Sequence, residues 1–484
     1  MAERIKIGWA ARDVTPRRPV MVRGLFNLRI STRVRDPLTL TALAIEGDGD
    51  HAIIASIDAC GADDEVIAQA RDVVGQRLPG FDPNKLVVSA THTHTGPFAG
   101  GRIGLQKEEE YLDAIRAKHP DYMTVAEYTR LLVDALADAA CEAWETRGKA
   151  SVGWGYSYAV VGENRRIRYF DARAVMYGKT NEPDFSHVEG HVDHGVNLLF
   201  TYRPDGALTG VVVNLACPSQ SNEGGQDYIS ADFWHDTRNE IRRRFGEKVF
   251  VLPQCSAAGD QTPHRQIAPQ AEDRMLRLKH GEGLSKGSNQ ALRLDIARRI
   301  ADAVSDAEPF VRKDLRENPP VRHVHRPLAL PHWNVTEKEY KEVREQIGQH
   351  EDALAALGDD DPLSARVTSL RSRINWCRRV VERYEDPPGS IPIEMTVIRL
   401  GDIAFVTAPF EYYLDFGDRI KGRSPAMQTF VVQLAGGGTY LPTERAAAGR
   451  SYGAVPASCR VSPKGGQVIV DEAVQILTQM FAAQ

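Results

Sequence analysis

The stretch LVVSATHTHTGP, residues 86–97, joins a short apolar run to two histidines and a Gly-Pro pair. The run 86–90 predicts a buried strand, and the i, i+2 spacing of His92 and His94 points both side chains the same way as the chain leaves it. Imidazole binds metal ions and exchanges protons near neutral pH. The strand end therefore predicts one wall of a site. The same sequence also fits a polar loop with two solvated histidines.

Strand and helix patterns alternate around this stretch. Residues 38–45 and 51–58 are apolar runs joined by Gly-Asp-Gly-Asp, which predicts a hairpin, and an amphipathic helix follows from about residue 63. A second hairpin is expected over 196–202 and 208–216, with a helix after it. The alternation predicts an α/β fold in which mixed β-sheets are flanked by helices.

Two charged amphipathic segments, about 335–356 and 363–385, predict a helical hairpin inserted at 335–386. No repeat, low-complexity linker or clean boundary divides the chain, so we expect one domain over residues 1–484. The charged faces of the hairpin are typical of solvated surfaces, and we expect it to serve packing or contact within a homo-oligomer rather than chemistry. Trp376 lies in the second segment and is more typical of a core than of a pocket.

Composition excludes several classes of protein. The chain has 484 residues with 60 basic and 65 acidic side chains, so no net basic charge attracts it to nucleic acid or anionic lipid. The chain contains no run of 18 apolar residues, so the sequence predicts no transmembrane helix. The N-terminus shows no secretory signal, and the six separated cysteines form no CxxC motif, which indicates reduced thiols and a cytoplasmic protein. A small molecule is the expected substrate.

Three further segments place reactive side chains just after apolar runs, where a sheet protein exposes them to a crevice. Cys217 ends the run 211–216, and a thiol there is either a small buried hydrophobe or a metal ligand. Asp260 and Thr262 lie in a loop of small residues that also fits a simple turn. Glu411 follows Pro409 at an expected helix start, where the helix dipole alone favours a carboxylate.

In their order along the chain, these segments resemble the neutral ceramidase family, a group of zinc-dependent amidases. The similarity runs from about residue 5 to about residue 460. The matching segments are GWAARDVTP (8–16), SATHTHTGP (89–97), GDQTP (259–263), PFE (409–411), TYLPT (439–443) and YGA (452–454). The two-histidine segment together with GDQTP is the most specific part of the match.

The resemblance implies a ceramidase-like catalytic domain that holds Zn²⁺. It also implies groups that face the scissile amide and its developing oxyanion, and a hydroxyl close to zinc where the family has serine. The implied zinc ligands are His92, Glu411 and Tyr440. The implied pocket residues are His94, Arg165, Thr262 and Tyr452.

The chain departs from the family at the second zinc histidine. The corresponding stretch reads Ala216-Cys217-Pro218, and a Cys217 thiolate can replace imidazole on zinc. A rival is His194, the last histidine of an HxxxHxxH pattern that starts at residue 187. We also expect no C-terminal immunoglobulin-like domain of the kind that known ceramidases carry and no apolar segment for docking on lipid, which argues against ceramide itself as the substrate.

We therefore expect a zinc-dependent hydrolase that cleaves a C–N amide or ester-like bond with metal-activated water. In this hypothesis Thr262 or Asp260 orients the water, and His94, Tyr452 and Arg165 stabilise the oxyanion. Two alternatives stay open. One is a Cys217 nucleophile with His94 or His235 as its base. The other is a family member that binds a small ligand without catalysis.

Overall fold

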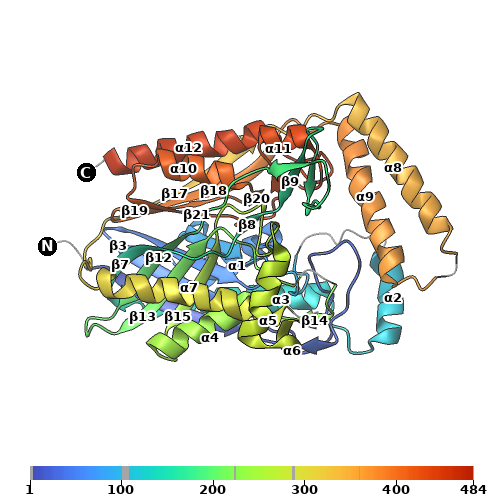
Figure 1. Ribbon diagram of the computed structural model, residues 1–484. Helices are drawn as coiled ribbons and strands as arrows, with labels where there is room; N and C mark the ends of the chain where they lie inside the picture. Colours follow the sequence, from blue (N-terminus) through green and yellow to red (C-terminus); the bar gives the residue numbers. More distant parts are fainter. Residues whose placement is uncertain (1–3, 101–107, 223–224, 286–288, 359, 483–484) are drawn as a thin grey trace.

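The computed structural model describes residues 4–100, 108–222, 225–285, 289–358 and 360–482, and it consists of three main β-sheets with helices outside them (Figure 1). The first sheet has the strand order β5-β4-β3-β1-β6. Its strands are β1 (Lys6–Asp13), β3 (Thr39–Gly47), β4 (Asp50–Ile57), β5 (Leu86–Ala90) and β6 (Gly148–Lys149). Helices α1 (Asp64–Arg77) and α3 (Val125–Glu145) bury one face of it.

The second sheet has the order β15-β13-β12-β7, and β13 and β15 run parallel. Its strands are β7 (Ser151–Tyr158), β12 (Gly195–Tyr202), β13 (Leu208–Leu215) and β15 (Phe250–Cys255). Helices α4 (Phe233–Phe245) and α7 (Gln290–Val311) pack on its outer face.

The third sheet has the order β17-β18-β19-β21. Its strands are β17 (Val321–Leu330), β18 (Ile391–Leu400), β19 (Ile403–Thr407) and β21 (Gln428–Val432). Helices α10 (Leu414–Arg423) and α12 (Pro463–Ala482) cover it. The inner faces of all three sheets share one apolar core, in which Trp9, Leu199 and Phe405 come from a different sheet each.

Short elements complete the chain. The two-residue pairs are β2 (Arg33–Val34) with β14 (Tyr228–Ile229), β8 (Glu163–Asn164) with β16 (Gln261–Thr262), and β20 (Glu411–Tyr412) with β22 (Tyr440–Leu441). A small sheet contains β9 (Arg166–Tyr169), β10 (Ala174–Met176) and β11 (Phe185–Val188). The remaining helices are η1 (Pro83–Lys85), α2 (Glu108–Lys118), α5 (Pro269–His280), α6 (Glu282–Ser285) and α11 (Glu444–Gly449).

The α/β class is confirmed, and so are both β-hairpins and the helical hairpin. The hairpin consists of α8 (Glu337–Ala355) and α9 (Ala365–Glu385), which project from the body in Figure 1. A capping box explains where α8 starts, because Thr336 and Glu339 each accept a hydrogen bond from the other's backbone N–H. Residue 359, in the turn between the helices, lies outside the described residues. No described helix has the length and apolar character that a membrane span requires.

Gly8 shows why the first matching segment begins with glycine. A Cβ at this position of β1 would lie 1.9 Å from the Ala143 carbonyl oxygen of α3. Only a residue without a side chain lets this helix approach the strand so closely. The close approach buries the apolar face of α3 on the first sheet.

We predict that Gly8→Ala lowers the free energy of unfolding by about 3 kcal/mol, the upper end for overpacking, because the obstacle is backbone. The matched control is Gly148→Ala in β6, where an added Cβ meets no heavy atom within 4 Å. Urea unfolding should show a change of less than about 0.5 kcal/mol for the control. Equal effects of the two substitutions would contradict the close approach.

Candidate metal centre and its surroundings

The site begins where two parallel strands end side by side. Strands β4 and β5 pair in parallel, with Ile57 opposite Ala90, so the loops that leave them start at the same sheet edge. The backbone N–H of His92 donates to the Ala59 carbonyl at 2.9 Å. The Nδ1 atom of His92 lies 2.6 Å from the Cys60 carbonyl oxygen, and this contact orients the imidazole.

His92 has a left-handed backbone, with φ of 67°, which is uncommon for a residue other than glycine. Hydrogen bonds on its C-terminal side hold this conformation. The hydroxyls of Thr93 and Thr95 both donate to the Ser230 carbonyl, at 2.8 and 2.9 Å. The Ser230 N–H donates in turn to the Thr95 carbonyl at 3.0 Å. Strain of this kind persists only where surrounding contacts fix the backbone.

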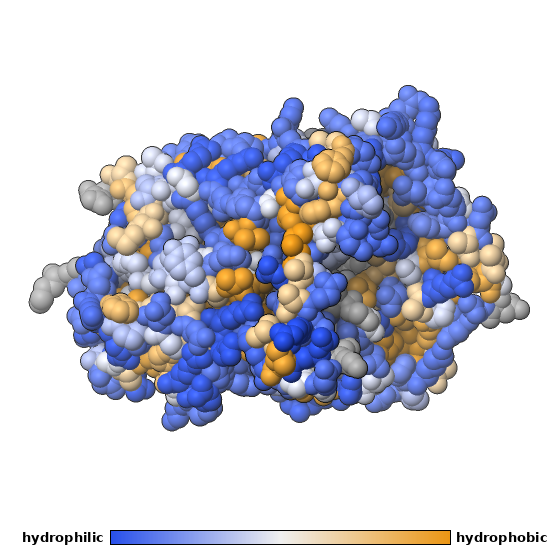
Figure 2. Space-filling view, viewed as in Figure 1, coloured by the Kyte–Doolittle hydropathy of each residue, from blue (hydrophilic) through white to orange (hydrophobic). Residues whose placement is uncertain are grey.

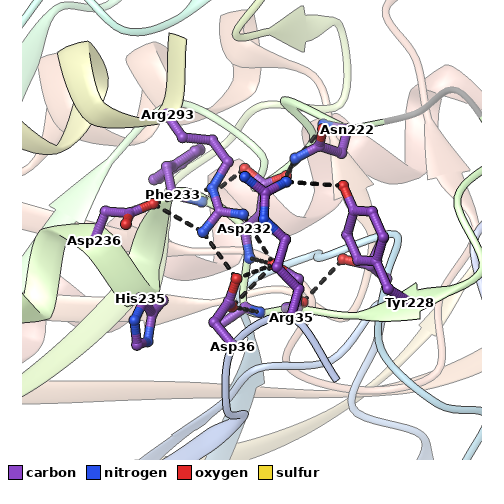
Figure 3. Close-up of polar contacts among 12 residues, drawn as sticks. Arg35, Asp36, Asn222, Tyr228, Asp232, Phe233, His235, Asp236 and Arg293 are labelled. Atoms are coloured by element: carbon purple, nitrogen blue, oxygen red, sulfur yellow. Dashed lines mark hydrogen bonds and ion pairs between the residues drawn. The ribbon is translucent and has the colours of Figure 1, made fainter. Parts of the chain in front are cut away.

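Figure 3 shows the Arg293 guanidinium between the Asp36 and Asp236 carboxylates. This buried ionic network fixes Ser230 itself. The Asp36 carboxylate accepts hydrogen bonds from the Ser230 hydroxyl at 2.8 Å and from the Ala231 N–H at 2.7 Å. The Arg293 guanidinium of α7 lies 3.0 Å from Asp36 and 2.8 Å from Asp236. Helix α4 begins after its N-cap Asp232, so Ser230 belongs to this network and does not cap the helix.

Glu411 and Tyr440 face His92 from the other end of the chain. They are opposite one another in the parallel pair β20–β22. The Glu411 Oε2 atom lies 3.2 Å from Nε2 of His92 and 3.8 Å from a guanidinium nitrogen of Arg165. Arg165 also donates to the Tyr440 hydroxyl at 3.2 Å. Gly438 permits this arrangement, since a Cβ there would lie 2.0 Å from the Pro409 carbonyl oxygen.

The charges of these groups are strongly coupled. Burial raises the pKa of the Glu411 carboxyl, but the adjacent His92 and Arg165 charges outweigh it and hold that pKa below its usual value. Burial opposes a charge on His92, yet the Glu411 carboxylate raises the His92 pKa well above normal. Burial and the Glu411 charge raise the pKa of the Tyr440 hydroxyl. Without a metal ion, the His92–Glu411 pair therefore holds a proton.

The residues around His92 fit a zinc ion. Because Nδ1 donates to the Cys60 carbonyl, Nε2 carries the lone pair once the shared proton has left, and this nitrogen is buried facing the Glu411 carboxylate. Two donor atoms bound to one tetrahedral zinc lie roughly 3.4 Å apart. The Nε2 of His92 and the Glu411 oxygen are 3.2 Å apart. Imidazole and carboxylate are typical zinc ligands, and the Tyr440 phenol oxygen beside them is the third ligand that the resemblance implies.

The structure adds Cys60, which the sequence interpretation missed. Ligand atoms of Cys60, His92 and His94 all lie within 4.8 Å of one another, and this is the group that the described residues offer for a metal ion. Cys60 follows the predicted apolar run 51–58, so a thiol just after a strand was a signal in the sequence. Its relevance depends on β4 lying next to β5, which no local pattern reveals.

His94 is a hydrogen-bond donor in this arrangement. Gln220 has a fixed amide orientation, since its Oε1 accepts from Arg165 at 3.2 Å. Its Nε2 therefore donates to Nε2 of His94, at 2.7 Å, which leaves the proton on Nδ1. Burial, with the neighbouring cationic His92, Arg29 and Arg165, lowers the His94 pKa well below normal, so the ring is neutral. Nδ1 has no hydrogen-bond partner among the described residues.

The two candidates for the second histidine's role make contacts with backbone groups. The Cys217 thiol is directed at the backbone oxygens of Val161 and Pro218, at 3.8 and 3.5 Å. His194 lies just before β12, and its carbonyl accepts a hydrogen bond from the Ala159 N–H. Of the other two histidines in its pattern, His187 contacts Ser186 and His191 pairs with Asp418 of α10. His235, the alternative base, contacts Asn239.

Asp260 and Thr262 have different surroundings. The Asp260 carboxylate accepts from Asn164 at 2.7 Å and from the Leu414 N–H at 3.0 Å, and burial raises its pKa. The Thr262 hydroxyl accepts from Tyr177 at 3.2 Å, and the same Tyr177 hydroxyl accepts from Arg165 at 3.3 Å. Thr262 is therefore linked to Arg165 through one phenol, whereas Asp260 fixes the loop.

Tyr452 lies on the solvent side of this centre and is 39% exposed. Its ring contacts Tyr440 edge-on, with centroids 5.4 Å apart. It also contacts Phe26 at 5.9 Å and Trp376 of α9 at 5.8 Å. The structure thus brings together His92, His94, Arg165, Glu411, Tyr440 and Tyr452.

A comparison with family models gives no match, and neither does a comparison with curated protein sequences. Two solved structures are similar in fold. One is the neutral ceramidase from Pseudomonas aeruginosa, with a TM-score of 0.68, 15% identity, and coverage of 98% of this chain and 75% of that chain. The other is a ceramidase solved in complex with C2, with a TM-score of 0.67, 15% identity, and coverage of 98% and 76%. The chain therefore has a ceramidase-like fold.

We predict that Arg293→Leu lowers the free energy of unfolding by about 3–5 kcal/mol, because it leaves Asp36 and Asp236 without their cation in a buried network. The control is Arg298→Leu, a half-exposed arginine whose partner Asp295 keeps Lys279 and Arg299. Denaturant titration should show an effect of at most about 1 kcal/mol for the control. The account of the network is wrong if both variants unfold alike.

Proposed function

We propose that this protein is a zinc-dependent hydrolase that cleaves an amide or ester-like bond of a small substrate. The observation that carries the proposal is the 3.2 Å separation between the buried Nε2 of His92 and the Glu411 carboxylate, beside Tyr440. The ceramidase-like fold supports it, because two solved structures with a similar fold are those of ceramidases.

We assign the metal to His92, Glu411 and Tyr440, with a cysteine thiol in place of the second histidine. The sequence favours Cys217 for that thiol. Cys60 is the cysteine grouped with His92 and His94, and because its Sγ lies 4.0 Å from Nδ1 of His92, a bond from Cys60 to an ion on Nε2 requires the thiol to turn. His94 is not assigned as a ligand, since Gln220 occupies its only lone-pair nitrogen. When bound, such an ion polarises a substrate carbonyl and lowers the pKa of water.

The chain's own residues then have distinct tasks. Water adds to the carbonyl carbon, the C–N bond breaks, and the amine leaves with a proton, giving a carboxylic acid and an amine. The Nδ1–H of His94 and the Tyr452 hydroxyl donate to the developing oxyanion, an effect worth about 3–4 kcal/mol for one good donor. Thr262 orients the water, and Arg165 fixes Glu411 and Tyr440. Asp260 is a positioning residue for the loop that carries Thr262.

We predict one zinc per purified chain and hydrolysis of at least one member of a panel of amides and esters. His92→Ala should lose the metal and all activity, because it removes the only nitrogen donor assigned. His187→Ala, an exposed histidine bonded to Ser186, is the matched control and should keep both. Metal analysis and turnover measure the outcome. Full zinc occupancy in His92→Ala would contradict the ligand set, and a metal-free, inactive wild type would favour a ligand-binding protein.

A second prediction separates the two cysteines. Cobalt(II) bound to a thiolate has a sulfur-to-metal charge-transfer absorption that nitrogen and oxygen ligands do not give. The band should appear in the cobalt-loaded wild type and in Cys217→Ser, and it should be absent in Cys60→Ser. Loss of the band in Cys217→Ser alone would restore Cys217 as the ligand. A cobalt-loaded wild type without any such band would exclude a thiolate ligand.

A further inference from the structure

A cavity of about 130 Å³ lies between the loop of residues 21–28 and helix α9. Its apolar wall consists of Met21, Leu25, Phe26, Leu28, Phe98 and Trp376. Phe26 and Trp376 meet edge-on, with ring centroids 5.5 Å apart. The sequence interpretation gave the helical hairpin no part in a site, and this wall is the observation that changes that view.

Residues that line the cavity contact the candidate metal centre at two places. Tyr452 packs on both Phe26 and Trp376 and on Tyr440, the neighbour of Glu411. On the other side, Gly24 lies so close to His94 that a Cβ there would be 2.6 Å from the imidazole. Gly24 therefore contacts the His94 imidazole, and the next two residues, Leu25 and Phe26, belong to the cavity wall.

The helical hairpin is fixed in place beside this loop. The Thr368 hydroxyl of α9 accepts from the Leu28 N–H at 3.0 Å, and Arg373 stacks over the Phe26 ring at 4.5 Å. Arg450, two residues before Tyr452, pairs with Glu342 of α8 at 2.5 Å. The outer side of α8 is hydrophilic (Figure 2). The apolar residues Val343 of α8 and Cys377 and Val380 of α9 are buried in one cluster between the two helices.

A larger cavity of about 430 Å³ lies on the other side of strands β20 and β22 from the candidate metal centre and is not part of that centre. Phe410 and Thr439 line it, whereas the next residues in the chain contact the centre: Glu411 contacts His92, and Tyr440 contacts Arg165. Neighbouring residues of a strand point to opposite sides, so the two spaces are separated by the β20–β22 backbone.

Cavity size limits what the smaller space can hold. An engineered apolar protein cavity of about 150 Å³ binds one benzene molecule. We propose that the 130 Å³ cavity receives one ring-sized apolar group of the substrate, and that Trp376 sets this size limit. The substrate class is then an amide or ester of an arylacetic or short branched acid rather than of a long-chain acid. This inference rests on the proposed function.

The test compares 4-nitroanilides of phenylacetic, octanoic and dodecanoic acid with the zinc-loaded full chain. The wild type should prefer the phenylacetyl compound over the dodecanoyl compound by at least about tenfold in kcat/KM, the scale on which apolar pockets discriminate. Trp376→Ala opens the cavity and should reduce that ratio at least about tenfold. The ratio of kcat/KM values should stay unchanged in Trp376→Phe and in the control Trp333→Phe, because Trp333 lies outside the cavity.

A binding measurement makes the two proposals separable. Phenylacetamide should change tryptophan fluorescence in the wild type and in Trp333→Phe, and the change should be lost in Trp376→Phe. If no anilide is hydrolysed but this signal behaves as stated, the hydrolase proposal fails and the cavity assignment holds. A wild type that prefers dodecanoyl, a ratio unchanged in Trp376→Ala, or a fluorescence change that persists in Trp376→Phe would overturn the assignment.

Discussion

The left-handed turn at His92 is the constraint on which the candidate metal centre depends. It turns the chain as it leaves β5, so the imidazole contacts Cys60 on one side and Glu411 on the other. Thr93 and Thr95 bind Ser230, and Asp36 and Arg293 hold Ser230 in a buried network. A conformation that costs about 1–3 kcal/mol is thereby supported by contacts from distant parts of the chain.

The same constraint explains the chemistry of the centre. Because Nδ1 of His92 is bound to a carbonyl, only Nε2 can bind a metal ion. The Glu411 oxygen lies at the distance from Nε2 that two ligands of one metal ion require. Gln220, fixed by Arg165, keeps the proton of His94 on Nδ1. One histidine is therefore suited to bind the metal and the other to donate a hydrogen bond, although both belong to one short motif.

Sequence patterns predicted much of this structure. Apolar runs and turn residues located the hairpins and the helical hairpin, and the resemblance selected His92, Glu411 and Tyr440, which the structure brings together. Cys60 was missed because its position in the site depends on β4 lying next to β5, which no local sequence pattern reveals. Trp376 was assigned to packing, since helical periodicity marks an apolar face without showing what covers it. The metal role of Cys217 stays a prediction.

Anomalous diffraction from zinc-loaded crystals tests the central claim most directly. The account predicts one zinc peak within bonding distance of Nε2 of His92 and of the Glu411 carboxylate, with Tyr440 beside it. A zinc ion bound instead at the histidines of residues 187–194, or no peak between His92 and Glu411 in protein shown to contain zinc, would contradict it.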